Sequence, residues 1–175
     1  MLIEIARHLP IWIYLLLGYL VFVGVRALRP RILSLWRLLA VPGVFIVWGV
    51  VGLFQRSAVV PDAFLHWGAG LAVGLALAFV LPLTMLIDRN AGRVRTPGSV
   101  VPLLRNLGLF AAHLVLNIAA ATHADTRLPF LGYDLLVSGL GFGYFAGWLW
   151  RFLRIYRTAP HTDLTPIDAV AAAQR

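Results

Sequence analysis

Residues 63–87 read AFLHWGAGLAVGLALAFVLPLTMLI, and no charged side chain interrupts them between Asp62 and Asp88. A helix needs about 20 apolar residues to cross a hydrocarbon core of about 30 Å. This stretch is therefore long enough to span a lipid bilayer. Its glycines are also typical of helices that pack closely inside membranes.

The composition of the whole chain also favours a membrane protein. Of its 175 residues, 61% are hydrophobic and 13% are charged, whereas an ordinary soluble domain is about half apolar and about a quarter charged. The polar residues are too few to cover a soluble globule. The absence of cysteine excludes disulfides, thiolate metal sites and cysteine nucleophiles. The sequence thus predicts an all-α integral membrane bundle.

Apolar runs of similar length recur along the chain between charged residues and prolines. They predict a transmembrane helical domain over residues 1–157 and a cytoplasmic tail over residues 158–175. The last run reaches spanning length only if Asp134 lies at the membrane interface. The first run is not followed by a small-residue cleavage site, so we expect a retained helix. The expected spans cover residues 9–28, 36–55, 63–87, 102–123 and 131–152.

Every basic residue is an arginine, and the arginines are unevenly distributed between the two sides of the predicted bundle. Positive residues stay cytoplasmic, so the amino terminus is expected outside and the carboxyl terminus inside. Arg93 and Arg95 are expected to contact anionic lipid headgroups. Because these arginines flank apolar runs, nucleic acid is not an expected partner. The opposite side holds Arg7, Arg56 and Arg127, whereas the inner side holds Arg26, Arg29, Arg31, Arg37, Arg89, Arg93, Arg95, Arg105, Arg151, Arg154 and Arg157.

Glycines at four-residue spacing mark two of the expected spans. Gly139, Gly143 and Gly147 share one face of the fifth span, and Gly70 and Gly74 share a face of the third. Small residues at this spacing let two helix backbones approach closely. The pattern predicts helix packing, either within one chain or between the subunits of a homo-oligomer.

A polar stripe follows the fourth span. Asn106, His113 and Asn117 are separated by seven and four residues and so share a helical face. His113 lies near the middle of the span, where a polar side chain in lipid is costly and usually faces the bundle interior. The stripe predicts hydrogen bonds that hold helices together. Ligand binding, haem ligation and proton transfer are the alternatives.

Polar residues also gather near the outer ends of the spans. Histidine and carboxylate together can bind a divalent metal, but the sequence has no HxxxH or HExxH pair. Only His113 is deep, so two haem ligands at matched depth are not expected. No nucleophile has an evident base beside it, and we expect neither an enzyme nor a bound cofactor. The outer group comprises His8, His66, His123, Asp62, Asp125 and Asp134.

Three short motifs carry a family resemblance. They are the segment RTPGS at residues 95–99 with PLLRN at 102–106, RHLPIW at 7–12, and LRPR at 28–31. In these motifs the chain resembles a group of small, uncharacterised proteobacterial inner-membrane proteins. The resemblance implies a multi-spanning fold and a bacterial location, and it supplies no catalytic residues.

Two functions are compatible with these patterns. The first is a structural or interaction component of the inner membrane, with lipid, a membrane protein or a second copy as its partner. The alternative is a small-molecule carrier or binding protein that uses the stripe of Asn106, His113 and Asn117. A water-accessible cavity beside the stripe would favour the alternative, and a packed interior would favour the first.

Overall fold

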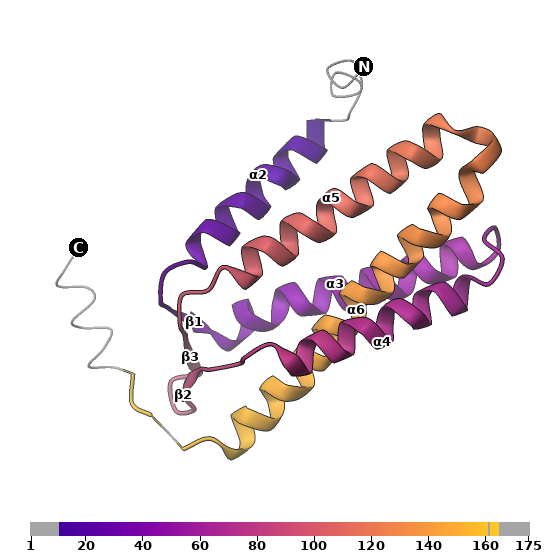
Figure 1. Ribbon diagram of the computed structural model, residues 1–175. Helices are drawn as coiled ribbons and strands as arrows, with labels where there is room; N and C mark the ends of the chain where they lie inside the picture. Colours follow the sequence, from indigo (N-terminus) through magenta and orange to yellow (C-terminus); the bar gives the residue numbers. More distant parts are fainter. Residues whose placement is uncertain (1–10, 161, 165–175) are drawn as a thin grey trace.

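The computed structural model describes residues 11–160 and 162–164, and these residues are mostly helical (Figure 1). Long helices alternate with short connections, and a small sheet forms from segments that lie between the helices. The helices are α2 (Ile11–Arg26), α3 (Leu35–Ser57), α4 (Ala63–Val80), α5 (Val101–Thr122) and α6 (Arg127–Thr158), with a short 3-10 turn η1 (Ala124–Thr126) before α6. The strands are β1 (Arg31–Ser34), β2 (Leu86–Asp88) and β3 (Arg93–Thr96).

Within the described residues, three helices are long and apolar enough to cross a membrane, namely α3, α4 and α5. This property supports the prediction of a helical membrane protein. The apolar part of α2, Ile13–Arg26, is shorter. Helix α6 is the longest, but it contains Asp134 and four arginines.

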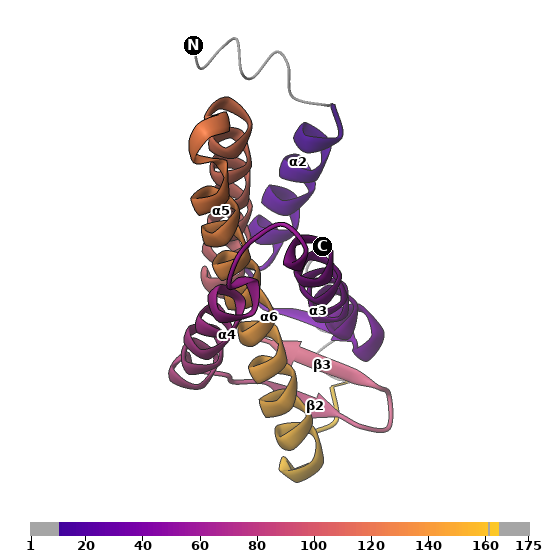
Figure 2. The same ribbon diagram turned by 90° about the vertical axis from the view of Figure 1, so that its right-hand side faces the viewer.

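Helix α6 lies at the centre of the bundle, and α3, α4 and α5 all pack against it (Figures 1 and 2). Helix α2 packs on α5 instead. The bundle has two ends: the sheet end, which carries β1–β3, and the loop end, which carries the turns at residues 58–62 and 123–126. Consecutive helices along the chain run in opposite directions, so α3 and α5 begin at the sheet end, whereas α4 and α6 begin at the loop end and lie parallel to each other.

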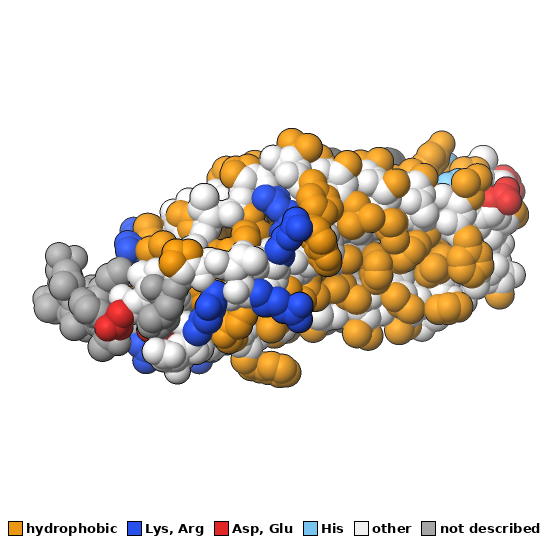
Figure 3. Space-filling view, turned by 90° about the horizontal axis from the view of Figure 1, so that it is seen from below, with side chains coloured by type: hydrophobic (Ala, Val, Ile, Leu, Met, Phe, Trp, Pro, Cys, Tyr) orange, Lys and Arg blue, Asp and Glu red, His pale blue; other side chains and the backbone are white. Residues whose placement is uncertain are grey.

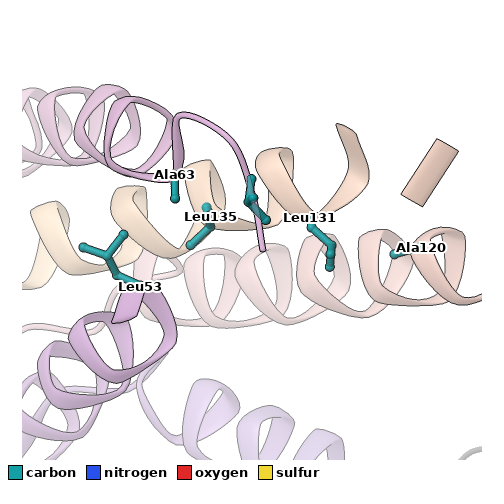
Figure 4. Close-up of a cluster of buried hydrophobic side chains, with 6 residues drawn as sticks. Leu53, Ala63, Ala120, Leu131 and Leu135 are labelled. Atoms are coloured by element: carbon teal, nitrogen blue, oxygen red, sulfur yellow. The ribbon is translucent and has the colours of Figure 1, made fainter. Parts of the chain in front are cut away.

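The buried apolar side chains form three clusters along α6. The cluster nearest the loop end joins α3, α4, α5 and α6 (Figure 4). A middle cluster surrounds Tyr144 and Phe145, and the third places Phe152 against Ile87 and Val94 of the sheet. The three clusters therefore follow one another from the loop end to the sheet. The first cluster comprises Leu53, Val60, Ala63, Ala120, Leu131 and Leu135.

The predicted third span, residues 63–87, is wrong at its carboxyl end, because α4 ends at Val80. Leu81 has extended dihedral angles, as expected for a residue that precedes a proline, here Pro82. The chain then leaves the bundle and forms β2. The second and fifth helices extend beyond their predicted bounds, to residues 35–57 and 127–158. Residues 9 and 10 of the first predicted span lie outside the described residues.

The sequence does not predict the sheet, because its strands fall between the predicted spans. Its strand order is β1-β3-β2, and both pairs are antiparallel. Asp88 pairs with Arg93 across the β2–β3 turn, in which the carboxylate of Asp88 accepts a hydrogen bond from the Ala91 N–H at 2.9 Å. Gly92 has a φ of 60°, which costs glycine little. Val94, on the central strand, is fully buried, so the sheet is stabilised by the end of α6 beneath it.

Part of the predicted cytoplasmic tail, residues 158–175, folds back onto the sheet. The Thr162 N–H donates to the carbonyl of Ile87 at 3.0 Å, and the Leu164 N–H donates to the Asp88 carboxylate at 3.2 Å. The Leu164 side chain is completely buried. These contacts cover the β2 edge of the sheet, which would otherwise present unpaired backbone groups.

Candidate functional site

A buried carboxylate joins three helices near the loop end. Asp134, on α6, is 3% exposed. Its Oδ2 forms an ion pair with Nη1 of Arg56 on α3. Its Oδ1 lies 2.6 Å from Nδ1 of His113 and 2.9 Å from Nδ2 of Asn117, both on α5. We call Arg56, His113, Asn117 and Asp134 the ionic cluster.

Hydrogen bonds between its other members complete the ionic cluster. Arg56 Nη2 donates to Oδ1 of Asn117 at 3.2 Å, and Nδ2 of Asn117 also donates to the His113 carbonyl at 2.7 Å. A carboxylate can only accept hydrogen bonds, so the Nδ1–H tautomer of His113 faces Asp134. Both carboxylate oxygens therefore have partners, and Arg56 connects α3 to α5.

The residues of the ionic cluster come from different positions along their helices. Arg56 stands one residue before the end of α3, and Asp134 stands seven residues after the start of α6. At 1.5 Å per residue, the seven residues between the start of α6 and Asp134 place Asp134 about 10 Å along α6. His113 and Asn117 are one turn apart on α5 and face the same neighbour. Asp134, which the sequence places at the membrane interface, is thus buried between the helices of the bundle.

The sequence identified half of this cluster. The spacing of His113 and Asn117 predicts that they share a face, whereas Arg56 and Asp134 are expected separately, near the outer ends of their spans. The predicted topology already held a signal for the missing pair, because both residues fall at the outer ends of predicted spans and carry opposite charges. Asn106 does not join the cluster; it is buried and accepts hydrogen bonds from Arg105.

The remaining outer histidines lie apart from the ionic cluster. His66 Nδ1 is 3.1 Å from the Asp62 carbonyl, and His123 contacts Thr122 and Phe130. Among the described residues, no three histidine or carboxylate side chains gather as metal ligands would. His8 lies outside the described residues.

The predicted packing glycines bring α4 and α6 into backbone contact. A Cβ at Gly70 or Gly74 of α4 would collide with the carbonyls of Leu136 or Leu140 on α6. Gly139 and Gly143 of α6 face carbonyls of α4 in the same way, and Gly147 lies against Ala78. Close packing of α4 on α6 therefore needs glycine on both helices.

An apolar groove follows α3 from Trp36 to Gln55, and none of the residues of the ionic cluster lines it.

Arginines gather at the sheet end. Arg93 and Arg95, predicted to contact headgroups, lie on the central strand of the sheet. Near the sheet, burial and then the charge of Arg26 lower the pKa of Arg31 from its ordinary value, which reflects crowding of positive charge at that end.

The chemistry open to the ionic cluster is hydrogen bonding and charge neutralisation. The 2.6 Å contact places the Nδ1–H of His113 against Oδ1 of Asp134. Arg56 neutralises the carboxylate. The His113 side chain is 38% exposed, so the cluster is closed around Asp134 and more open at His113. Comparison of the chain with protein-family models, curated proteins and solved structures finds no match.

Proposed function

We propose that the chain is a bacterial inner-membrane protein with five spans, in which α2 and α6 cross the bilayer together with α3, α4 and α5. Helix α6 is covered by three apolar helices, which explains how it can carry Asp134 across the membrane. The sheet end carries most of the arginines, so it is placed in the cytoplasm with the carboxyl terminus. The amino terminus is then outside.

Within that membrane the proposed role is that of a structural or interaction component. The observation that carries this proposal is the closed set of partners around Asp134, which come from α3 and α5. A substrate site keeps polar groups free for its ligand, whereas here both oxygens of the carboxylate are already occupied. The cluster fixes the positions of three helices, and the glycine contact fixes α4.

The free energies of the contacts in the ionic cluster favour one arrangement of α3, α5 and α6 over the others. Interhelical hydrogen bonds in membranes are worth about 0.6 kcal/mol on average, so they add little to overall stability. Removing one partner of a buried ion pair is far more costly, at about 3–5 kcal/mol, because the other charge is left alone. Wrong helix arrangements that separate Arg56 from Asp134 are penalised by that larger amount.

Asp134→Asn and Arg56→Gln test this role. Arg56→Gln leaves the buried Asp134 without its cation, and Asp134→Asn leaves the partly buried Arg56 without its anion, so each should lower the melting temperature in detergent. The double variant should be less destabilised than the sum of the two, because neither charge remains. Asp125→Asn is the matched control, since Asp125 is exposed at the loop end. Additive effects, or melting temperatures equal to that of the control, would contradict the proposed role.

The carrier function is the second candidate, and the partial exposure of His113 and Asn117 favours it. Ionisable groups inside a membrane domain usually mark sites that bind ions or polar ligands. Native mass spectrometry and an absorption spectrum of the purified protein address this directly. A bound small molecule that His113→Leu abolishes, with stability unchanged, would favour the carrier over the structural role.

A further inference from the structure

An exposed aromatic pair lies at the sheet end of the contact between α4 and α6. The rings of Phe79 and Trp150 are 5.6 Å apart, and each side chain is about half exposed. The guanidinium of Arg151 lies 5.9 Å from the centroid of the Phe79 ring. The guanidinium of Arg154 lies 5.1 Å from the Trp150 ring. Two cations therefore rest on a continuous aromatic surface.

Helix geometry and the end of α4 fix the two arginines. Arg151 and Arg154 are three residues apart on α6 and so share a face. Arg151 Nη1 donates to the carbonyl of Leu81 at 2.7 Å and also to that of Ala78, which are acceptors at the carboxyl end of α4. Rings and backbone carbonyls therefore orient both guanidinium groups, and no carboxylate of the described residues forms an ion pair with either of them.

Carboxylates are scarce at this end of the molecule. Among the described residues only Asp88 and Asp163 belong to it, and Asp88 is buried with its oxygens bonded to the N–H groups of Ala91 and Leu164. Figure 3 shows arginine side chains gathered toward the sheet end, beside an apolar surface that extends toward the loop end. Within the described residues, the partners of Arg151 and Arg154 are rings and backbone carbonyls, so an anion from outside this part of the chain can still pair with them.

We propose that Arg151 and Arg154, with Phe79 and Trp150, bind the headgroup phosphate of an anionic phospholipid in the leaflet next to the sheet end. Guanidinium groups pair with phosphate through parallel hydrogen bonds. Tryptophan prefers the boundary between headgroups and hydrocarbon, where the ring pair can lie against the glycerol and the start of the acyl chains. This site rests on the proposed membrane placement and is separate from Arg93 and Arg95 of the sheet.

The test measures lipid binding by native mass spectrometry of the purified full chain in detergent, titrated with phosphatidylglycerol or phosphatidylcholine. The wild type should retain phosphatidylglycerol preferentially, because only this lipid has a net negative charge. Arg154→Gln should weaken its binding about fivefold, the loss expected for one arginine beside an anionic headgroup. Arg157→Gln is the matched control, since it removes the same charge from the exposed last turn of α6, and it should change binding little.

Equal weakening by Arg154→Gln and Arg157→Gln would overturn the site, because it would mean that net charge alone attracts the lipid. Equal retention of the two lipids by the wild type would overturn it as well. If Arg154→Gln fails to fold, Phe79→Leu keeps every charge, removes the ring beneath Arg151 and should still weaken binding. Alkaline extraction of cell membranes tests the placement separately: protein released into the soluble fraction would contradict the proposed function, whereas embedded protein without lipid preference contradicts this site alone.

Discussion

Asp134 has a different environment from that of the other described carboxylates near the loop end. Asp62 and Asp125 are exposed in turns, whereas Asp134 is buried and receives contacts from Arg56, His113 and Asn117. The cost of burying a charge explains the difference, because a carboxylate inside the bundle must be neutralised and fully hydrogen-bonded. The polar groups of α3 and α5 meet that requirement.

His113 and Asn117 share one acceptor, Oδ1 of Asp134. His113→Ala and Asn117→Ala should each lower the free energy of unfolding by about 0.6–1.7 kcal/mol, the range for interhelical hydrogen bonds. The double variant should lose less than the sum, because the two groups act on the same oxygen. His113→Leu should cost less than His113→Ala, since it refills the volume.

Thermal or denaturant unfolding in detergent measures these changes, with His123→Ala as the control because His123 is exposed near the loop end. Strict additivity would show that the two side chains act independently. Full stability of both variants, with loss of a bound small molecule, would show that the stripe is a ligand site instead.

Helices α4 and α6 form the closest pair in the bundle, and glycine makes that closeness possible. Gly143 approaches the backbone of Leu71, where a Cβ would collide with the Leu71 carbonyl. The glycines are thus occupied by contacts within one chain, which favours intramolecular packing over a homo-oligomer interface through this face. The tilted contact between the rings of Trp67 and Phe142 lies beside it.

The prediction for this element is that Gly143→Leu separates α4 from α6. Overpacking a tight contact costs about 1–3 kcal/mol or more, so the melting temperature should fall clearly. Gly108→Leu is the matched control, because Gly108 is also helical and exposed, and a Cβ there meets nothing within 4 Å. Equal melting temperatures for the two variants would mean that α4 and α6 are not packed in this way in the membrane. If Gly143→Leu instead dissociated a dimer and left the melting temperature unchanged, the glycine contact would lie between two subunits.

The charged residues of the molecule are distributed unevenly between its two ends. Its sheet end carries arginines on the sheet and on the ends of α2 and α6, whereas the loop end carries Asp62, Asp125 and the exposed His123. The charge asymmetry favours a cytoplasmic sheet end.

A reporter that is active only in the periplasm tests this orientation. Fused after Arg175, which preserves the contacts of Leu164 with the sheet, it should be inactive. Fused after His123, between α5 and α6, it should be active. The opposite pattern would reverse the orientation, and activity at both positions would contradict a fifth span formed by α6.

Much of the fold could be predicted from local sequence. The apolar runs located the helices to within a few residues, because helix formation and membrane insertion depend on the composition of each segment. The carboxyl end of α4 was misplaced because residues 81–87 are uncharged, and hydrophobicity alone did not reveal that Leu81, before Pro82, leaves the helix. The sheet was missed because β1, β2 and β3 are too short to show a strand pattern.

The sequence by itself predicted a membrane environment and the approximate extent of the helices. It also determined the glycine faces of α4 and α6 and the stripe on α5. Each of these features depends on residues that lie close together along one helix. Only the tertiary structure decided that Arg56 and Asp134 join that stripe. The two residues are 78 positions apart, and each alone resembles an ordinary residue at the end of an apolar run. Their pairing follows from the way in which α3 and α5 pack on α6, since the burial of a charge is decided by its neighbours in space.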